Sequence, residues 1–374
     1  DTLGTALLFA SVFRKKPANY ALICNNQYSA QKTYEFLLNF IKEEDVAFFP
    51  ADELLRAETL SSSRELMSQR LYAMGQLTNG KPHILITHPS ALLRYQANPA
   101  DFLKSSFTLQ VGDRIDLEDL KSRLSEMGYS RVNKIDQSLQ FASRGDILDV
   151  FSVNFLKPIR IEFFGDEVDS IRYFDISTQT SKESVKSVSV FPATDLFMTD
   201  DRISEITDKI NERLEGDAQI IGQSEFEVLK DNVLRDLEDI VGRNYKPSLY
   251  RYYGFAQKHP YSILSFMNPE ICFIADKEGF STSVDMLQQE ADRFYGELFA
   301  ARSITTRLSH YMSPKDSMRD AERIVYGTKF QKYQSDKVFN VRSITTVSTG
   351  IASFIPLIQS YLDYNKKVVI AISD

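Results

Sequence analysis

The sequence has few of the residues that build metal sites and disulfide frameworks: its 374 residues include two cysteines and four histidines. Cys24 and Cys272 lie far apart with no other cysteine near either, which predicts reduced, buried thiols of a cytoplasmic protein. The histidines are His83, His88, His259 and His310. They show no metal-ligand spacing and no acidic or nucleophilic partner, so we expect surface or capping positions for them and no metal site. We expect no other cofactor either.

Long apolar runs are also missing. No run approaches the ~18 residues that a helix needs to cross a bilayer, and no signal peptide opens the chain, so we expect no membrane partner. The formal net charge of −7 disfavours bulk binding of duplex DNA, because such binding needs Lys and Arg to neutralise phosphates. The net charge does not argue against a local basic patch. Since the chain starts at Asp1 without Met and ends in the strand-like run KKVVIAISD, we interpret it as a piece of a longer protein.

The motifs of nucleotide-binding and hydrolytic enzymes are absent. No G-x-x-x-x-G-K-[ST] occurs, and after Gly4-Thr5 the first lysine, Lys15, comes a full helix later. Asp52-Glu53 follows an apolar strand as an acidic Walker pair would. Without a P-loop, we interpret this pair as carboxylates at a helix N-terminus, which the helix dipole favours. Neither G-x-S-x-G nor H-E-x-x-H is present, so we predict that this chain is not an enzyme.

Apolar strands alternate with helical patterns over the first hundred residues, which is typical of a parallel sheet in an α/β layer. The expected strands are 20–24, 46–49 and 83–87, and the expected helices are 2–13, 29–40, 61–77 and 89–95. From about Phe107, one helix and a run of alternating strands through Val190 predict an α+β unit. The α/β pattern then resumes, with helices at 199–214, 225–241 and 284–301, a strand at 271–275, and a final strand–helix–strand from 338 to 372.

The hairpin centred on Gly165-Asp166 is the most informative stretch. Residues with strand propensity alternate with polar ones on both sides of this Gly-Asp step, which indicates two antiparallel strands joined by a two-residue turn. If Ile159, Ile161 and Phe163 face a core, then Arg160, Glu162 and Phe164 face the other way. Phe164 would then stand among charges, as aromatic residues do in protein-binding surfaces. The alternative is that a second layer covers this face and makes Phe164 part of a core.

Two motifs, RGDILDVFSVN (144–154) and PIRIEFFGDEVDSIRYFD (158–175), resemble the second domain shared by UvrB and the bacterial transcription-repair coupling factors (Mfd). FPATDLF (191–197) matches the exit from that domain. UvrB also has an intact P-loop and a tyrosine-rich hairpin, whereas the corresponding FFPADELLRAETLSSS (48–63) is short and has no tyrosine. The resemblance is therefore to the N-terminal UvrB-homology module of the coupling-factor family.

This resemblance implies a fold and a domain organisation. The fold would be α/β, with a degenerate helicase-like parallel α/β domain that an α+β domain interrupts. The helicase-like domain would comprise residues 1–106 and 193–330, and the inserted domain residues 107–192. Residues 331–374 would begin a small third α/β domain.

The resemblance also implies a function, which is recruitment of the damage-recognition protein UvrA to stalled transcription sites in nucleotide excision repair. Carried over by motif position, Arg144, Arg160 and Phe164 would contact UvrA. We expect Glu162 to join them through an ion pair across the interface, while the pattern alone does not fix the side of the sheet on which Arg144 lies. The full-length relatives would in addition be ATP-dependent translocases that bind RNA polymerase and double-stranded DNA.

Two other functions remain open from the sequence. The run SLYRYYGFAQKHPY (248–261) interleaves tyrosine with basic residues, and Tyr250, Arg251 and Tyr252 could stack on a DNA strand in a helicase-like or UvrB-like remnant. Packing of this run within a loop is the interpretation that the acidic composition favours. A UvrB-like ATPase whose P-loop precedes residue 1 is the third reading.

We predict that this chain does not bind ATP, because no lysine is placed to meet the phosphates. Isothermal calorimetry with Mg-ATP should show no saturable heat. A dissociation constant in the micromolar range would contradict this prediction.

Overall fold

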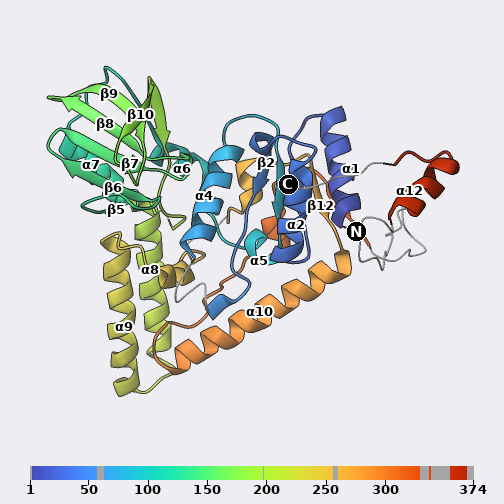
Figure 1. Ribbon diagram of the computed structural model, residues 1–374. Coiled ribbons are helices and arrows are strands. Elements are labelled where there is room, and N and C mark those ends of the chain that lie inside the picture. Colours follow the sequence, from blue (N-terminus) through green and yellow to red (C-terminus); the bar gives the residue numbers. More distant parts are fainter. Residues whose placement is uncertain are drawn as a thin grey trace.

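Two sheets organise the chain (Figure 1). The computed structural model describes residues 2–56, 63–196, 198–255, 260–328, 337 and 354–368. Within these residues there are a five-stranded parallel sheet, a six-stranded sheet that is almost wholly antiparallel, and a two-stranded ribbon. The chain is thus a parallel α/β unit combined with antiparallel β-structure, as the sequence predicts.

The parallel sheet is buried on both faces except at its edge strand β13 (Ile324–Tyr326). Its strands run in the order β13, β12 (Ile271–Ile274), β1 (Tyr20–Ile23), β3 (Ile84–Thr87) and β2 (Val46–Phe48). Helices α1 (Thr2–Lys15) and α2 (Gln27–Leu38) pack on one face, where alternate residues of β1 and β3 meet them. The other face packs against α4 (Arg64–Leu77) and the first turn of α10 (Lys277–Ala300). Burial on both faces is the reason why these strands read as continuous apolar runs.

The parallel sheet joins parts of the chain that are far apart in sequence. Strand β1 pairs in parallel with β12, in the register Tyr20↔Ile271 to Ile23↔Ile274. The residues that separate them include the whole antiparallel sheet. This pairing is the arrangement expected of an α/β body interrupted by an insertion, although the proposed limits of that insertion, residues 107–192, remain a prediction.

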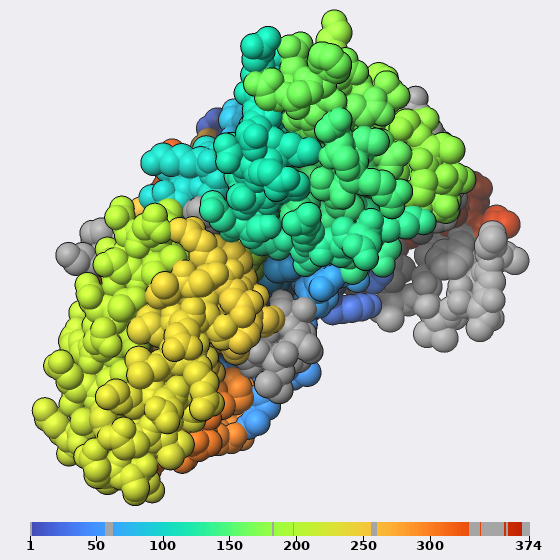
Figure 2. Space-filling view, turned by 90° about the vertical axis from the view of Figure 1, so that its left-hand side faces the viewer, coloured from blue at the N-terminus to red at the C-terminus, as the bar shows by residue number. Residues whose placement is uncertain are grey.

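The antiparallel sheet lies beside this body. Its order is β10 (Ser181–Val185), β9 (Glu167–Phe174), β8 (Ile159–Phe164), β7 (Ile147–Phe151), β6 (Gln140–Arg144) and β5 (Ser130–Arg131), with only β5 parallel to its neighbour. The ribbon pairs β4 (Phe107–Gln110) with β11 (Ser187–Val190). Helix α7 (Leu117–Glu126), capped by Asp116 as expected, contributes Leu120 and Leu124 to the core under the sheet. In Figure 2 this region forms one lobe above helices α8 and α9.

Two long helices, α8 (Asp200–Asp217) and α9 (Gln223–Val241), pack on each other, and Thr199 caps the first as predicted. Helix α10 begins seven residues earlier than expected, at Lys277 instead of Val284. Gly279 and the Ser-Thr-Ser run 281–283 have low helix propensity, so the sequence does not indicate this first turn. The buried side chain of Phe280 holds it against the core.

The shorter helical elements complete the described chain. They are η1 (Glu43–Asp45), α5 (Pro89–Leu92), α6 (Pro99–Ser105), η2 (Pro247–Tyr252), η3 (Ile263–Phe266), α11 (Pro314–Ser317) and α12 (Phe354–Asp363). Helix α12 lies within the predicted final strand–helix–strand, and both strands of that prediction fall outside the described residues. None of the helices in the described ranges has the length and apolarity that a membrane crossing requires.

The histidines correct one expectation. His83, His88 and His310 are buried rather than at the surface, and His88 alone is a cap, since it precedes α5. Burial lowers the pKa of His88 to about 3, so its ring is neutral and accepts a hydrogen bond from the backbone N–H of Ala51 at 3.2 Å. His259 lies outside the described residues. Cys24 and Cys272 are buried free thiols, as predicted.

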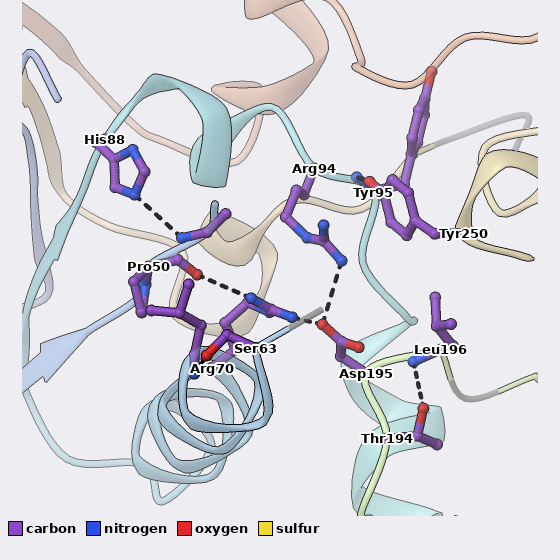
Figure 3. Close-up of polar contacts among 12 residues, drawn as sticks. Pro50, Ser63, Arg70, His88, Arg94, Tyr95, Thr194, Asp195, Leu196 and Tyr250 are labelled. Carbon is purple, nitrogen blue, oxygen red and sulfur yellow. Dashed lines mark hydrogen bonds and ion pairs between the residues drawn. The ribbon is translucent and has the colours of Figure 1, made fainter. Parts of the chain in front are cut away.

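A buried ion cluster joins the exit of the antiparallel region to the α/β body (Figure 3). The carboxylate of Asp195 accepts hydrogen bonds from Arg70 Nε at 2.7 Å and from Arg94 NH2 at 3.3 Å. All three side chains are buried, and the Arg94 guanidinium stacks 4.1 Å from the Tyr250 ring centroid. Burial alone would raise the pKa of Asp195, but the charges of the two arginines outweigh it and hold the pKa below its usual value.

A close backbone approach accompanies this cluster. Gly75 of α4 faces the ring of Phe191, and a Cβ atom at Gly75 would lie 2.1 Å from Phe191 Cε2. The absence of a side chain at this position therefore lets Phe191 pack directly against α4. The contacts of Phe191 and of the nearby Asp195 together hold the antiparallel region in a defined orientation relative to the α/β body.

We predict that Asp195→Asn lowers the free energy of unfolding by about 3–5 kcal/mol at pH 7, because it leaves two buried guanidinium charges without a counter-ion. The pKa of Asp195 is lower in the folded state than in the unfolded state, so the ion cluster stabilises the fold above the unfolded pKa of about 4. This contribution is lost as the pH falls through the folded pKa.

Urea unfolding at several pH values tests this prediction, with Glu215→Gln, an exposed change on α8, as the matched control. The stability difference between wild type and Asp195→Asn should shrink as the pH falls below about 4. An equal stability of the two proteins at pH 7 would contradict the role given to the cluster.

Candidate protein-binding surface

The outer face of strands β6 to β9 carries the residues predicted from the sequence. Along β8, the side chains of Ile159, Ile161 and Phe163 are buried in the core, and that of Phe163 is 6% exposed. Phe164 is 83% exposed. The alternation therefore has the predicted parity. The interpretation that a second layer buries Phe164 is wrong.

Two Gly-Asp turns lie at the same end of this face. Gly165, with φ +64°, begins the turn from β8 to β9, and Gly145, with φ +58°, begins the turn from β6 to β7. A glycine with positive φ at the first turn position suits the right-handed twist of a two-residue hairpin. The backbone N–H of Phe163 donates to the carbonyl of Asp146 at 2.9 Å, so the first turn lies next to the end of β8.

The strand register settles the position of Arg144. Arg144 pairs with Ile147 across the first hairpin, and Ile147 pairs with Glu162 on β8. Residues directly opposite each other on antiparallel strands project from the same face. Arg144, which is exposed, therefore lies on the face of Glu162 and Phe164. The half-buried Ile147 between them was not singled out from the sequence, although the alternation along β7 could have indicated it.

Arg160 lies on the same face but is engaged within the sheet. Its Nε and NH2 atoms donate to the two carboxylate oxygens of Asp149 at 2.7 and 2.8 Å, and NH1 donates to the carbonyl of Gln179 at 3.4 Å. The guanidinium also stacks 4.6 Å from the ring centroid of Phe174. The hydrogen bonds that Arg160 donates to the Asp149 carboxylate raise the pKa of Arg160. The side chain keeps only 19% exposure.

Glu162 has partners of its own on β9. Its Oε2 atom accepts from Ser170 Oγ at 2.8 Å and lies 3.3 Å from Arg172 NH2. Both contacts are partly exposed, so the carboxylate can still be reached from outside. The ion pair that we expect between Glu162 and a partner would compete with Arg172, and it remains a prediction.

The opposite end of the outer face is closed. Ile135, Ala142 and Phe174 form a small buried cluster there, with Phe151 packed against it. This local second layer covers the ends of the strands away from the Gly-Asp turns. Solvent therefore reaches the face chiefly at its turn end, around Arg144, Ile147 and Phe164.

In residues 248–255 of the tyrosine-rich run, all of which the structure describes, the tyrosines do not form a surface. Tyr250, Tyr252 and Tyr253 are buried, and both Arg251 and the Tyr252 hydroxyl bond to the carboxylate of Asp236, the latter at 2.7 Å. Packing within the loop is thus confirmed, and the proposed stacking of Tyr250, Arg251 and Tyr252 on a DNA strand is wrong. The adjacent helices α8 and α9 hold thirteen acidic and five basic residues, a balance that repels phosphates.

One member of the acidic pair after β2, Glu53, lies at a helix N-terminus, as was predicted for the pair. Glu53 Oε1 accepts a hydrogen bond at 2.8 Å from the backbone N–H of Gln27, the first residue of α2. A carboxylate at this position complements the helix dipole.

Comparison with known proteins identifies the antiparallel region first. A family model described as the UvrB interaction domain matches residues 107–196, which include the whole candidate surface. The transcription-repair-coupling factor of Bacillus subtilis (strain 168) is 31% identical over 296 residues, which are 77% of this chain and 25% of that protein. That of Staphylococcus aureus (strain USA300) is 32% identical over 224 residues, 60% of this chain and 19% of that protein.

The chain is related to transcription-repair-coupling factors. The resemblance to their N-terminal UvrB-homology module, predicted from the two motifs, is therefore confirmed. The chain spans about a quarter of the length of the Bacillus relative.

We predict that substitutions of two adjacent phenylalanines of this domain differ strongly in their effect on stability. Phe163→Ala should lower the free energy of unfolding by about 3–5 kcal/mol, because it opens a cavity in the core. Phe164→Ala should change it by less than about 0.5 kcal/mol, as surface substitutions do. Urea unfolding of both variants measures the contrast. If Phe164→Ala were the more damaging change, the assignment of faces would be inverted.

Proposed function

We propose that this chain recruits UvrA through the outer face of β6 to β9, as the N-terminal module of a transcription-repair-coupling factor in nucleotide excision repair. The match to the UvrB interaction domain and the relationship to coupling factors support this proposal. Arg144, Arg160, Glu162 and Phe164 are the residues proposed to make up the binding surface.

The exposure of Phe164 carries the proposal. An aromatic ring that is 83% exposed at the end of a firm, paired strand contributes little to the core. It has the geometry of a binding anchor, which gains free energy when a partner covers it. Ile147 adds apolar area beside it, and Arg144 adds a positive charge. A partner of matching shape would present an apolar recess with acidic groups at its rim.

The remaining parts of the proposal concern the longer protein. We propose that the full-length protein is an ATP-dependent DNA translocase that also binds RNA polymerase and double-stranded DNA in the cytoplasm. The present chain would be its non-catalytic recruitment module. The reading as a DNA-binding remnant has no support here, since the tyrosines on which it depended are buried.

We predict that Phe164→Ala weakens UvrA binding by roughly 30-fold to 1000-fold, because truncating a central aromatic anchor costs ~2–4 kcal/mol. Surface plasmon resonance with immobilised UvrA measures the change. Leu156→Ala is the matched control: Leu156 is 100% exposed and precedes β8 at its other end, so its truncation removes a similar apolar group away from the proposed contact.

The control should bind UvrA as the wild type does. Equal binding by Phe164→Ala and wild type would overturn the proposed surface. An equal loss of affinity in both variants would instead show that non-specific apolar contacts, rather than this face, drive the association.

A further inference from the structure

The outer face carries a row of alternating charges that extends beyond the residues implied by the family resemblance. Arg160 pairs in register with Arg172 of β9, so two like charges stand directly opposite each other, which is unfavourable by itself. Asp149 neutralises Arg160 from one side and Glu162 neutralises Arg172 from the other. Each of the two opposed arginines is therefore neutralised by its own carboxylate.

The two opposed arginines differ in what they can offer to a partner. All three nitrogen atoms of the Arg160 guanidinium donate within the chain, two of them to the same carboxylate in the strong bidentate geometry. Within the described residues, Arg172 makes one ion pair, 3.3 Å long, with a carboxylate that Ser170 shares. Its side chain is 40% exposed, against 19% for Arg160.

We infer that Arg172 is a further partner-contacting residue of this face, and that Arg160 acts through Asp149 as a positioning residue without touching the partner. The inference rests on the proposed function and refines it. Arg144 and Arg172 then present guanidinium groups on either side of Ile147, Glu162 and Phe164. Such an arrangement fits carboxylates of UvrA that surround an apolar recess.

The role of Arg160 follows from the charge balance of the face. Arg144, Arg160 and Arg172 stand against Asp149 and Glu162, and Glu167, opposite Phe164, is paired with Arg114 at 3.5 Å. These seven groups together carry one net positive charge. Without Arg160, the carboxylate of Asp149 is uncompensated, so it repels an acidic partner and competes with Glu162 for Arg172. Removal of Asp149 together with Arg160 restores the net positive charge.

A double-mutant cycle tests the positioning role, because it separates action through Asp149 from direct contact. Arg160→Ala should weaken UvrA binding about tenfold, and the double variant Asp149→Ala, Arg160→Ala should bind within about threefold of the wild type. If the double variant binds as weakly as Arg160→Ala, then Arg160 touches UvrA itself and the inference is wrong.

Arg172→Ala tests the new contact. It should weaken binding about tenfold and reduce the dependence of the affinity on salt, while the melting temperature stays close to that of the wild type. Lys104→Ala removes one positive charge from the exposed surface of α6 and should change neither quantity. Unchanged affinity of Arg172→Ala would overturn the assignment of this residue.

The proposed function and this inference can fail separately. If the wild-type chain of 374 residues does not bind UvrA, the proposed function fails and the inference fails with it. If Phe164→Ala weakens binding but Arg172→Ala does not, the surface is correct and only the further assignment is lost.

Discussion

The position of the candidate surface depends on the buried carboxylate of Asp195. Asp195 follows the antiparallel region in the chain, and its side chain lies between those of Arg70 of α4 and Arg94 (Figure 3). All three side chains are buried, so solvent does not screen their charges. A lone carboxylate buried in this way would be protonated, and a lone guanidinium would be costly to bury, so each group depends on the others. Because the bonds have specific directions, the cluster sets an orientation as well as an attachment. Phe191, packed against Gly75 a few residues earlier, closes the same junction with apolar contacts.

This attachment explains why the antiparallel sheet exposes only one part of one face. Its inner face continues the core of the α/β body, since the buried side chains of β7, β8 and β9 belong to the same apolar cluster as those of α4 and α7. A small second cluster around Phe174 closes one end of its outer face. The turn end is left open because two Gly-Asp turns end the strands there and no further element of the described chain packs over Phe164, which is 83% exposed. The apolar ring thus remains available, and covering it can contribute up to about 3 kcal/mol to an association.

The sequence predicted the parity of β8 and hence the exposure of Phe164, because alternation along one strand is a local property. The side of Arg144 could not be predicted in this way, since it follows from the register of β6 on β7 and of β7 on β8. The ion pair between Arg160 and Asp149 could not be predicted for the same reason. The two residues lie on different strands, and only the strand register shows that they are neighbours. Helix α6 was not predicted from the sequence, although Asn98 forms its cap and Pro99 is a first-turn proline. The histidines were misplaced because burial of a neutral ring depends on tertiary packing that no spacing reveals.

We infer two separate functions for the charges of this face, which differ in how far they are shielded from water. Ion pairs that are largely shielded from water, such as Arg160 with Asp149, hold strands in register and keep their geometry when a partner approaches. More exposed charges, such as Arg172 and Arg144, lose more hydration on contact but are free to meet groups on another protein. On the proposed function, substituting either kind should weaken binding, so the loss of affinity alone would not identify a contact residue. The two kinds of charge differ in the affinity of the double variant that also lacks the internal partner. Deleting an internal ion pair as a unit should restore the affinity, whereas deleting a residue that contacts the partner protein should not.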